Sequence, residues 1–596
     1  MTTAAPAPPS STPPIWPHCR HGATAADPVG CRGIRVGVHT GCLAHLADTD
    51  RDAYLNGLTP GADIDHRGTP ITEDLLDRLL TALHDPTTRR PHIGTAWFDG
   101  ATFIGTAWFA GAAFTGDAQF GGVTFTGEAW FGGAAFSGDA GFARAAFTGD
   151  AWFGGAAFSG DAGFARAAFT GTAWFDEVTF AGAAQFGGAT FTGTARFAWV
   201  TFTGDAQFGG VTFTKDARFD GARFETASRL GPLVCGAKVV LDRVVFDQPV
   251  TVEMAAREVS CVRTRWASTA TLHLRYAEVD LRDAVLEYPV VVAARPDPFP
   301  SLSLYSYDPL SEVELSGREP GVRLTSVGGV DAAHLALYTI DLSGCRFAGA
   351  IHLDQLRVDG WCTFATAPAD RGRRFPWRWS RRNTLAEEHH WRVRTARHAT
   401  PGWTAPPQGA PELPPAAVAA LYRQVRKSLE DGKNEPDAAD FYYGECEMRR
   451  HDTTRPQGER VLLTAYWALS GYGLRATRAL AWLGVAMAVT IAVMVLWGLP
   501  ADDPKPTTTG RQVTIGHKIV LTTDTPNSVN PTGPPAERVT TERLEKGLRV
   551  VINSVIFRSS GQDLTTTGTY TEMASRLAEP VLLGLAVLAI RSRVKR

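Results

Sequence analysis

The chain has 596 residues, more than one hydrophobic core usually organises, so several modules are expected. Its formal net charge of −2 and sequence pI of about 6.7 give no general electrostatic attraction to nucleic acid, so no nucleic-acid partner is expected. Eight cysteines scattered over so long a chain do not resemble a disulfide framework.

The N-terminal segment, residues 1–17, is rich in proline, serine and threonine and lacks both a basic start and an apolar run. We therefore expect a disordered leader and no cleaved signal peptide.

Cysteine and histidine cluster in the next module, residues 18–90. Zinc sites use four Cys or His ligands, and the CLAH segment supplies two of them at x₂ spacing. The candidate ligands are Cys19, Cys31, Cys42 and His45. Cys19 and His21 are separated by a single residue, a poor spacing for a standard knuckle, which favours the alternative of buried thiols and incidental histidines. A structural zinc is thus the candidate cofactor, and the function is expected to require none.

The same module ends in the segment ITEDLLDRLLTALH, residues 71–84. Its leucines recur at helical spacing behind a Thr that can cap the first turn, which predicts an amphipathic helix. Solenoids need terminal caps, so this helix is expected to cover the first coil of the repeat that follows.

Phenylalanine dominates residues 91–225. It recurs 24 times between Phe98 and Phe224, at steps that alternate between five and six residues, and Ala or Val precedes each ring by two positions. Residues 129–150 return as residues 151–172 with only the last position changed, so the repeating unit has 22 residues. A helix cannot keep such steps on one face. A closed four-sided coil can, with one ring pointing inward from each side.

This pattern of a small residue, any residue, then Phe resembles the pentapeptide-repeat family. The resemblance implies a right-handed four-sided parallel β-helix, in which coils stack at roughly 4.8 Å. The family's usual coil has 20 residues, whereas this one has 22. Residues 226–366 carry weaker strand-like alternation and a Pro-rich insertion from about 294 to 325, so they are predicted to be irregular further coils.

Two columns of outward side chains repeat at coil spacing in the predicted β-helix. The aromatic column contains Trp108, Trp130, Trp152 and Trp174; the acidic column contains Asp117, Asp139, Asp161 and Asp205. The tryptophans could grip a partner, or they could stack on one another and stabilise the coils, which we favour. The aspartates could attract a basic partner, or they could be a hydrated face, which we favour.

Residues 367–460 are predicted to be an Arg/Trp/Pro-rich linker followed by two amphipathic helices, at 417–431 and 437–450. The latter resemble the connector of membrane-attached pentapeptide-repeat proteins. Four consecutive titratable residues, Glu387 to His390, point in different directions on a helix and are not expected to form a site. The sequence contains no nucleophile motif, phosphate loop or dinucleotide fingerprint, so no enzyme is expected.

A membrane hairpin is predicted for residues 461–596, with spans at about 479–499 and 573–590. Arg576 and Glu579 are expected to neutralise each other at one interface. Arg475 and Arg478 precede the first span, and Arg591, Arg593, Lys595 and Arg596 lie at the end of the chain. The positive-inside rule then predicts a multi-pass cell-membrane protein whose solenoid and C-terminus are cytoplasmic.

The segment between the spans is predicted to contain a flexible Pro/Thr-rich loop, a helix at 544–557 and an LTTTG loop. This order resembles the pore hairpin of two-span cation channels, but it lacks the aromatic-glycine filter, and Arg558 would repel cations. A degenerate hairpin that serves as an anchor is therefore favoured over a functional pore.

These expectations combine into a non-enzymatic, membrane-anchored protein that presents a cytoplasmic β-solenoid as a protein-interaction scaffold. Its expected partners are the lipid bilayer and an unidentified protein on the solenoid face, and a homo-oligomer is compatible with it. The alternatives are a channel-like protein whose solenoid senses a ligand or assembles the oligomer, and a DNA mimic that binds gyrase, as some pentapeptide-repeat proteins do.

Overall fold

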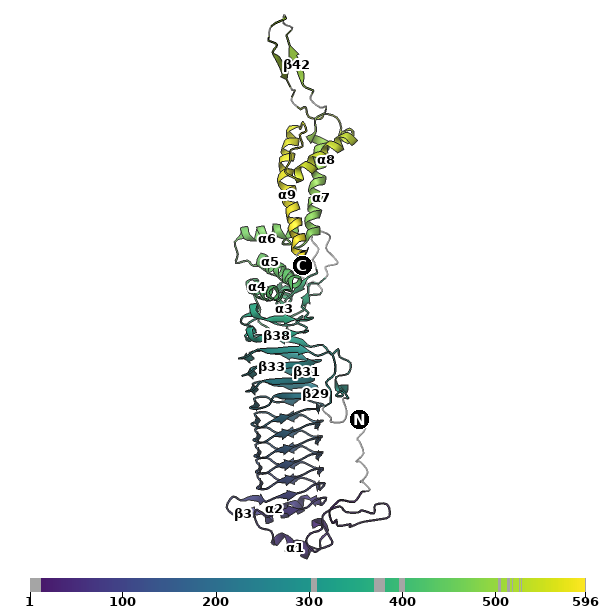
Figure 1. The fold of residues 1–596 in the computed structure, drawn as a ribbon, viewed down its shortest axis with the longest axis vertical. Helices are drawn as coiled ribbons and strands as arrows, with labels where there is room; N and C mark the ends of the chain where they lie inside the picture. The colour runs from purple at the N-terminus through teal and green to yellow at the C-terminus, as the bar shows by residue number, and fades with distance from the viewer. Residues whose placement is uncertain are drawn as a thin grey trace. The chain divides into compact units, whose positions relative to one another are not determined.

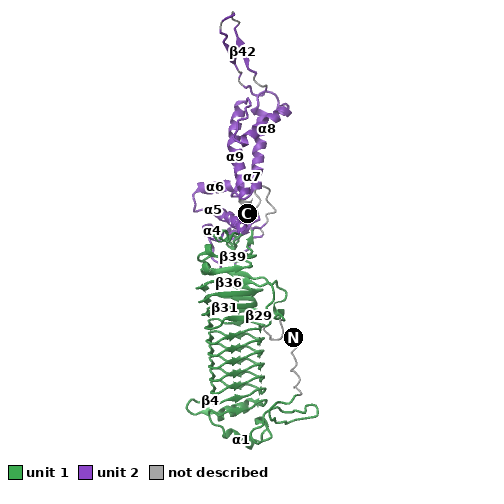
Figure 2. Ribbon diagram, viewed as in Figure 1, with its two compact units in different colours: residues 1–366, 384–390, 427–433 green, residues 367–383, 391–426, 434–596 purple. Residues whose placement is uncertain are grey.

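The computed structural model describes residues 12–301, 308–368, 381–395, 402–501, 505–511, 515–516, 518–524, 526 and 528–594. Most of the predicted leader, the middle of the Pro-rich insertion, much of the Arg/Trp/Pro-rich linker, and the terminal Lys595 and Arg596 lie outside these residues, as does the side chain of Arg593. The chain divides into two compact units, one with residues 1–366, 384–390 and 427–433 and the other with the remainder (Figure 2).

The first unit is a parallel β-solenoid of about 12 coils, which confirms the predicted fold class (Figure 1). Each regular coil places one short strand on each of four faces, and strands one coil apart pair in parallel. Ala107 pairs with Ala129 and Ala129 with Ala151, so the regular coil has the predicted 22 residues.

The strands of the regular coils are grouped by face as follows. The first face contains β1 (Ile64–Asp65), β5 (Ala96–Trp97), β9 (Ala118–Gln119), β13 (Ala140–Gly141), β17 (Ala162–Gly163), β21 (Ala184–Gln185) and β25 (Ala206–Gln207). The second contains β2 (Pro70–Thr72), β6 (Thr102–Ile104), β10 (Thr124–Phe125), β14 (Ala146–Phe147), β18 (Ala168–Phe169), β22 (Thr190–Phe191) and β26 (Val211–Phe213). The third contains β7 (Ala107–Trp108), β11 (Ala129–Trp130), β15 (Ala151–Trp152), β19 (Ala173–Trp174), β23 (Ala195–Arg196) and β27 (Ala217–Arg218). The fourth contains β4 (Arg90–Ile93), β8 (Ala113–Phe114), β12 (Ala135–Phe136), β16 (Ala157–Phe158), β20 (Thr179–Phe180), β24 (Thr201–Phe202) and β28 (Arg223–Phe224).

Phenylalanine fills the interior of these coils, as predicted. All 24 rings between Phe98 and Phe224 are at most 1% exposed, and the small residues two positions earlier are equally buried. Rings one coil apart lie nearly parallel: Phe153 stacks on Phe131 at 4.9 Å and on Phe175 at 4.8 Å. The small Ala or Val leaves room for the ring beside it, and the stacked rings form a continuous core.

Two kinds of corner explain the alternating five- and six-residue steps. The five-residue corner contains a residue with positive φ, such as Gly133 at +64° or Arg144 at +58°. The six-residue corner contains a glycine that lies against the coil below: a Cβ on Gly138 would lie 2.8 Å from the carbonyl oxygen of Gly116. No other residue allows so close a backbone approach. The extra residue of the 22-residue coil therefore sits where stacked glycines form the turn.

The coils become irregular after β28, as predicted. Strands β29 (Arg229–Val240) and β31 (Val250–Ser260) each continue around a corner, and Val245 pairs with Arg265, so the coil shortens to 20 residues. Further strands are β30 (Val245–Phe246), β32 (Arg265–Trp266), β33 (Ala270–Arg275), β34 (Glu278–Asp280), β35 (Val285–Leu286), β36 (Val290–Ala294), β37 (Arg323–Ser326), β38 (Leu335–Tyr338) and β39 (Arg357–Asp359). The Pro-rich insertion packs Phe299 and Leu315 against Val234 and Ala255 of the coils.

The N-terminal end of the solenoid carries α1 (Asp48–Asn56) and α2 (Glu73–Ala82). The predicted helix is confirmed, but it begins at Glu73 because Ile71 belongs to β2, which pairs with β6. The Thr72 side chain accepts a hydrogen bond from the backbone N–H of Leu75, and Leu75, Leu76, Leu79 and Leu80 are buried. Figure 1 shows α2 across the end of the coils, where a cap is needed.

The second unit is mainly helical. It contains parts of α3 (Ala386–Thr395) and α4 (Pro415–Asp431), and all of α5 (Glu435–His451), α6 (Gln457–Ser470), α7 (Ala476–Val493), α8 (Thr541–Val555) and α9 (Thr566–Val594). Both connector helices and the helix at 544–557 match the prediction, whereas α6 was not predicted. The Pro/Thr-rich loop was expected to be flexible, but it contains an antiparallel hairpin of β42 (Thr507–Gly510) and β43 (Leu521–Asp524).

Candidate functional site

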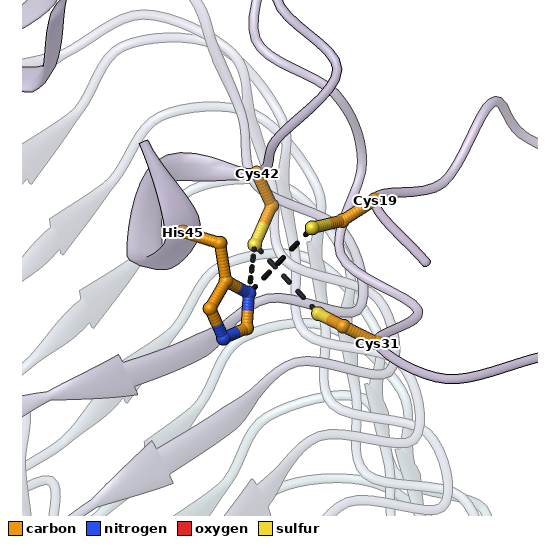
Figure 3. A group of neighbouring side chains, drawn as sticks. All are labelled: Cys19, Cys31, Cys42 and His45. Carbon is orange, nitrogen blue, oxygen red and sulfur yellow. Dashed lines mark hydrogen bonds between the residues drawn. The ribbon is translucent and has the colours of Figure 1, made fainter. Parts of the chain in front are cut away.

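Four candidate metal ligands converge in the N-terminal module (Figure 3). The Sγ atoms of Cys31 and Cys42 are 3.7 Å apart. The Nδ1 atom of His45 lies 3.3 Å from Cys42 Sγ and 3.6 Å from Cys19 Sγ. All four ligand atoms lie within 4.8 Å of one another. His21, the other histidine near the cluster, stacks its ring on that of His45 with centroids 4.1 Å apart.

Two local structures bring these side chains together. Cys19 and Cys31 lie on opposite arms of an irregular hairpin, in which the N–H of Cys19 donates to Gly33 O and the N–H of Arg20 donates to Cys31 O. Cys42 immediately precedes a single 3₁₀ turn, η1 (Leu43–His45), and His45 is its last residue. The CxxH spacing in the sequence identified the second pair. The position of Cys19 beside Cys31 depends on the hairpin, which the spacing did not reveal.

The two closest thiols have unequal proton affinities. The Cys42 side chain hydrogen-bonds the Cys31 sulfur and lowers the pKa of Cys31 to about 5. The same hydrogen bond, together with burial, raises the pKa of Cys42 far above its ordinary value.

The tryptophan column forms a stacked ladder on the third face. Trp108 and Trp130 have ring centroids 5.0 Å apart, and the next two pairs are 4.7 Å and 4.6 Å apart. The Arg196 guanidinium continues the column 4.2 Å above the Trp174 ring. Trp108 at the lower end is 57% exposed, while the other three rings are half-buried. The four rings therefore stack on one another from coil to coil.

The aspartate column has a structural role that the sequence analysis missed. Asp117 Oδ1 accepts a hydrogen bond from the N–H of Asp139 at 3.0 Å, and Asp139 accepts one from Asp161 at 2.9 Å. Asp161 accepts one from the N–H of Ala183, one coil further on. These carboxylates follow the stacked corner glycines and satisfy N–H groups that the turn leaves without a strand partner. Asp205 instead accepts a hydrogen bond from Gln207 Nε2.

A family model described as Pentapeptide repeats (9 copies) matches residues 120–168, 164–210 and 175–223. The regular coils of this chain are pentapeptide repeats. The match lies inside the segment that the phenylalanine spacing predicted, and it supports no statement on the rest of the chain. No curated protein and no solved structure matches the chain.

Glu387, one of the four consecutive titratable residues, hydrogen-bonds the backbone near the C-terminal end of the solenoid. Glu387 Oε1 accepts hydrogen bonds from the N–H groups of Phe347 and Ala348 at 2.6 Å and 3.0 Å. His389 bonds to the Thr384 hydroxyl through Nε2 at 2.9 Å. Burial raises the pKa of Glu387, although the two N–H groups oppose this. Glu387 and His389 therefore each have a structural partner.

A buried ionic cluster in the second unit escaped the sequence analysis. The Glu447 side chain is fully buried, and its Oε1 accepts hydrogen bonds from Arg392 at 3.1 Å and Arg450 at 2.7 Å. Its Oε2 accepts one from the Tyr472 hydroxyl at 2.9 Å. Burial alone would raise the pKa of Glu447, but the hydrogen bond from His451 and the two arginine charges outweigh it and hold that pKa well below its usual range.

Among the residues that the structure describes, two helices are long and apolar enough to cross a membrane, Ala476–Gly498 and Thr566–Arg591. The first comprises α7 and a terminal π turn, η5 (Met494–Gly498). Thr490 of the first helix donates a hydrogen bond to Glu579 of the second at 3.0 Å. The predicted partner of Glu579 was Arg576, but Arg576 instead pairs with Glu572 at 2.8 Å, one helical turn before it.

The LTTTG segment, residues 564–568, was compared with the pore hairpin of channels, and it is mostly helical. Helix α9 begins at Thr566, so Thr566, Thr567 and Gly568 form its first turn. The Thr565 hydroxyl donates to the carbonyl of Trp497 at 2.7 Å, at the end of the first apolar helix. A filter needs an extended backbone whose carbonyls line the ion path. The LTTTG segment was predicted to be a loop, and it is largely the start of a helix.

Proposed function

We propose that this chain is a non-enzymatic membrane protein whose two apolar helices anchor a pentapeptide-repeat solenoid, which serves as a cytoplasmic scaffold for a protein partner. The anchor is supported by the side chains of the two apolar helices: polar groups lie between the helices, and apolar groups lie on their outer surface. Thr490 and Glu579 are buried between the helices. Large apolar side chains face outward: Leu480, Val485, Val489, Leu577, Val581, Val587 and Leu588 are 45–72% exposed. Lipid is the solvent that such a surface requires.

The scaffold role follows from the filled interior of the coils. The phenylalanine stack leaves the regular coils, residues 96–224, without an internal ligand cavity. A partner must therefore bind the outer surface, where side chains repeat at the spacing of the coils. The Trp108 end of the tryptophan ladder is the most exposed part of that column and offers an aromatic contact. A solenoid with a filled interior and a repeated outer surface suits a role in binding a partner rather than a role in catalysis.

The charge distribution supports a cytoplasmic solenoid. Arg475 and Arg478 lie immediately before or within the first turn of α7, and Arg591 follows the apolar part of α9. Both flanks belong to the same side of the hairpin, opposite the Thr-rich β42–β43 segment. The positive-inside rule favours the cytoplasm for that side. The segment between the two apolar helices also carries Lys and Arg, such as Arg538, Arg543 and Arg549, so the orientation needs a direct test.

An anchor is better supported than a pore by the contacts of Arg543. Its guanidinium donates hydrogen bonds to the carbonyls of Val495, Leu499 and Pro500, which end the first apolar helix. A cation fixed at this point would repel permeant cations. The helical start of α9 also argues against an extended filter.

For the gyrase-binding alternative, the hydrogen bonds of the aspartate column already explain why acidic residues recur there.

Thiol labelling of the full chain in intact cells tests anchor and orientation together. Thr523→Cys, between the apolar helices, should react with an impermeant reagent. Thr148→Cys, on the solenoid surface, should react only after permeabilisation. The unsubstituted chain is the control for labelling of native cysteines. Labelling of Thr148→Cys in intact cells would contradict the orientation, and recovery of the chain in the soluble fraction would contradict the anchor.

The scaffold role needs its own experiment. A photo-crosslinking amino acid at position 108, the exposed end of the tryptophan ladder, should trap a defined protein in native membranes. The same amino acid at position 523 is the matched control, because that loop is proposed to face the opposite side. Ion currents from the purified chain in planar bilayers, or equal crosslinking at both positions, would contradict the proposal.

A further inference from the structure

We infer that Cys19, Cys31, Cys42 and His45 bind one zinc ion that holds the N-terminal cap of the solenoid in its folded form. The inference is independent of the membrane-anchored scaffold role, because it concerns a different part of the chain and a different chemistry. Three sulfurs and one imidazole nitrogen make the Cys₃His set that structural zinc sites use.

Three of the six ligand separations are close to those of a tetrahedral zinc site, and all six lie within 4.8 Å. Bonds of about 2.3 Å to sulfur and about 2.0–2.1 Å to nitrogen at tetrahedral angles place two sulfurs about 3.8 Å apart and a sulfur and a nitrogen about 3.6 Å apart. The Cys31–Cys42 sulfur separation is 3.7 Å, and His45 Nδ1 lies 3.3 Å and 3.6 Å from its two sulfurs. The sulfurs of a disulfide would be only about 2.05 Å apart.

Gly33 lets the hairpin approach the second ligand pair, because a Cβ at this position would lie 2.7 Å from Cys42 Sγ. The backbone of the hairpin therefore leaves room for ligand atoms packed at close range.

The module has little else to hold it together. Residues 12–47 contain one 3₁₀ turn and one isolated bridge, between His18 and Ile34, as their regular structure. Their buried apolar side chains, apart from Cys42, are few: Val29, Val36, Leu43 and Leu46. Segments below about 40 residues usually need a metal, disulfides or a partner to fold. A zinc ion linking both ends of residues 19–45 supplies that constraint.

The zinc-binding module lies against the first strand of the solenoid, so an ion that stabilises the module also keeps that strand covered. The N–H of Ile34 donates to Arg67 O at 2.8 Å, just after β1. The Arg67 guanidinium lies 5.0 Å over the Trp16 ring, and Trp16 Nε1 donates to Arg32 O. These contacts fix the module beside β1, the strand that ends the first face. Covering such an edge prevents pairing with another chain.

Metal analysis of the full chain provides the first test. Chain purified in detergent under reducing, chelator-free conditions and supplied with zinc should retain about one zinc per chain, and cobalt in its place should give the strong absorption of a tetrahedral thiolate site. Cys42→Ser and His45→Ala should each lower zinc retention at least tenfold. Cys362→Ser, a half-buried thiol outside the cluster, is the matched control and should retain zinc. Absence of stoichiometric zinc, a Cys31–Cys42 disulfide, or equal loss in the control would overturn the inference.

Hydrogen exchange tests the structural role without any substitution. Removal of zinc by a chelator should accelerate amide exchange in residues 17–69 by at least tenfold and leave residues 120–223 unchanged. Return of zinc should restore protection. If stripping the zinc leaves exchange in residues 17–69 unchanged, the ion does not hold the cap and the inference fails.

Discussion

Replacement of Phe153 by Ala tests the packing of the solenoid at its most regular point. The Phe153 ring is fully buried and stacks between Phe131 and Phe175. It also makes edge contacts with Phe142 and Phe164, at centroid distances of 5.5 Å and 5.4 Å. The substitution therefore removes one ring from a continuous column and leaves a hole that full coils enclose above and below.

The expected loss of unfolding free energy is about 3–5 kcal/mol, the usual range for Phe→Ala in a core. Two stacked pairs add about 0.5–1.5 kcal/mol each beyond simple burial, which favours the upper half of that range. Relaxation around the hole is restricted, because hydrogen bonds such as Phe153 N–H to Trp174 O, 2.7 Å long, fix the spacing of adjacent coils. Larger neighbouring movements would break this ladder.

Denaturant unfolding of the full chain in detergent, followed by circular dichroism, measures the loss. The matched control is Gln119→Ala, a half-buried side chain on the outer side of β9, which should change the unfolding free energy by no more than about 0.5 kcal/mol. Coils interact with their nearest neighbours, so exchange in the Phe153→Ala chain should rise most in residues 131–175. Equal destabilisation by both substitutions would refute the assignment of inward and outward positions.

Two further substitutions test polar groups. Asp161→Ala should cost about 0.5–1.5 kcal/mol in the same unfolding measurement, whereas Asp161→Asn, which keeps an acceptor for the N–H of Ala183, should cost less; equal costs would contradict the hydrogen-bond role. Glu447→Gln should cost about 3–5 kcal/mol at pH 7, because it removes the buried negative charge that accepts hydrogen bonds from Arg392 and Arg450. Since the pKa of Glu447 is lower in the folded chain than the unfolded value of about 4.3, its stabilisation is present above that pH and declines as the pH falls through the folded pKa. The difference between the original and substituted chains should therefore shrink in acid, and a constant difference would contradict the ionic role.

The solenoid could be predicted because its determinants are local and repeated. Each Phe and the small residue two positions before it indicate the same inward direction, and 24 copies leave little room for another fold. The structure of the corners was harder to predict from the sequence. Gly116 and Gly138 are 22 residues apart, and the need for glycine arises only when their backbones stack. The role of the aspartates follows from the same stacking, so composition alone suggested an acidic face and not a hydrogen-bond ladder.

The candidate metal centre could be predicted in part for a similar reason. Cys42 and His45 are three residues apart, so one helical turn brings them together and the sequence spacing reports it. Cys19 and Cys31 meet through a hairpin whose tip is shaped by Asp27, which accepts hydrogen bonds from the N–H groups of Val29 and Gly30. Such a tip has no fixed ligand spacing. The short Cys19–His21 interval therefore argued against zinc until the geometry of the hairpin was available.

The Glu447 cluster was inaccessible to sequence reasoning because its members come from three separate segments. Arg392 belongs to α3, Glu447 to α5, and Tyr472 to the turn between α6 and α7. None of the three is unusual in its own surroundings, and a charge inside an amphipathic helix normally indicates a solvent-exposed face. Their convergence is costly unless every partner is present, since a buried carboxylate without its cations is strongly destabilising. The cluster therefore fixes the turn at Tyr472 against α5, a few residues before the first apolar helix begins at Ala476.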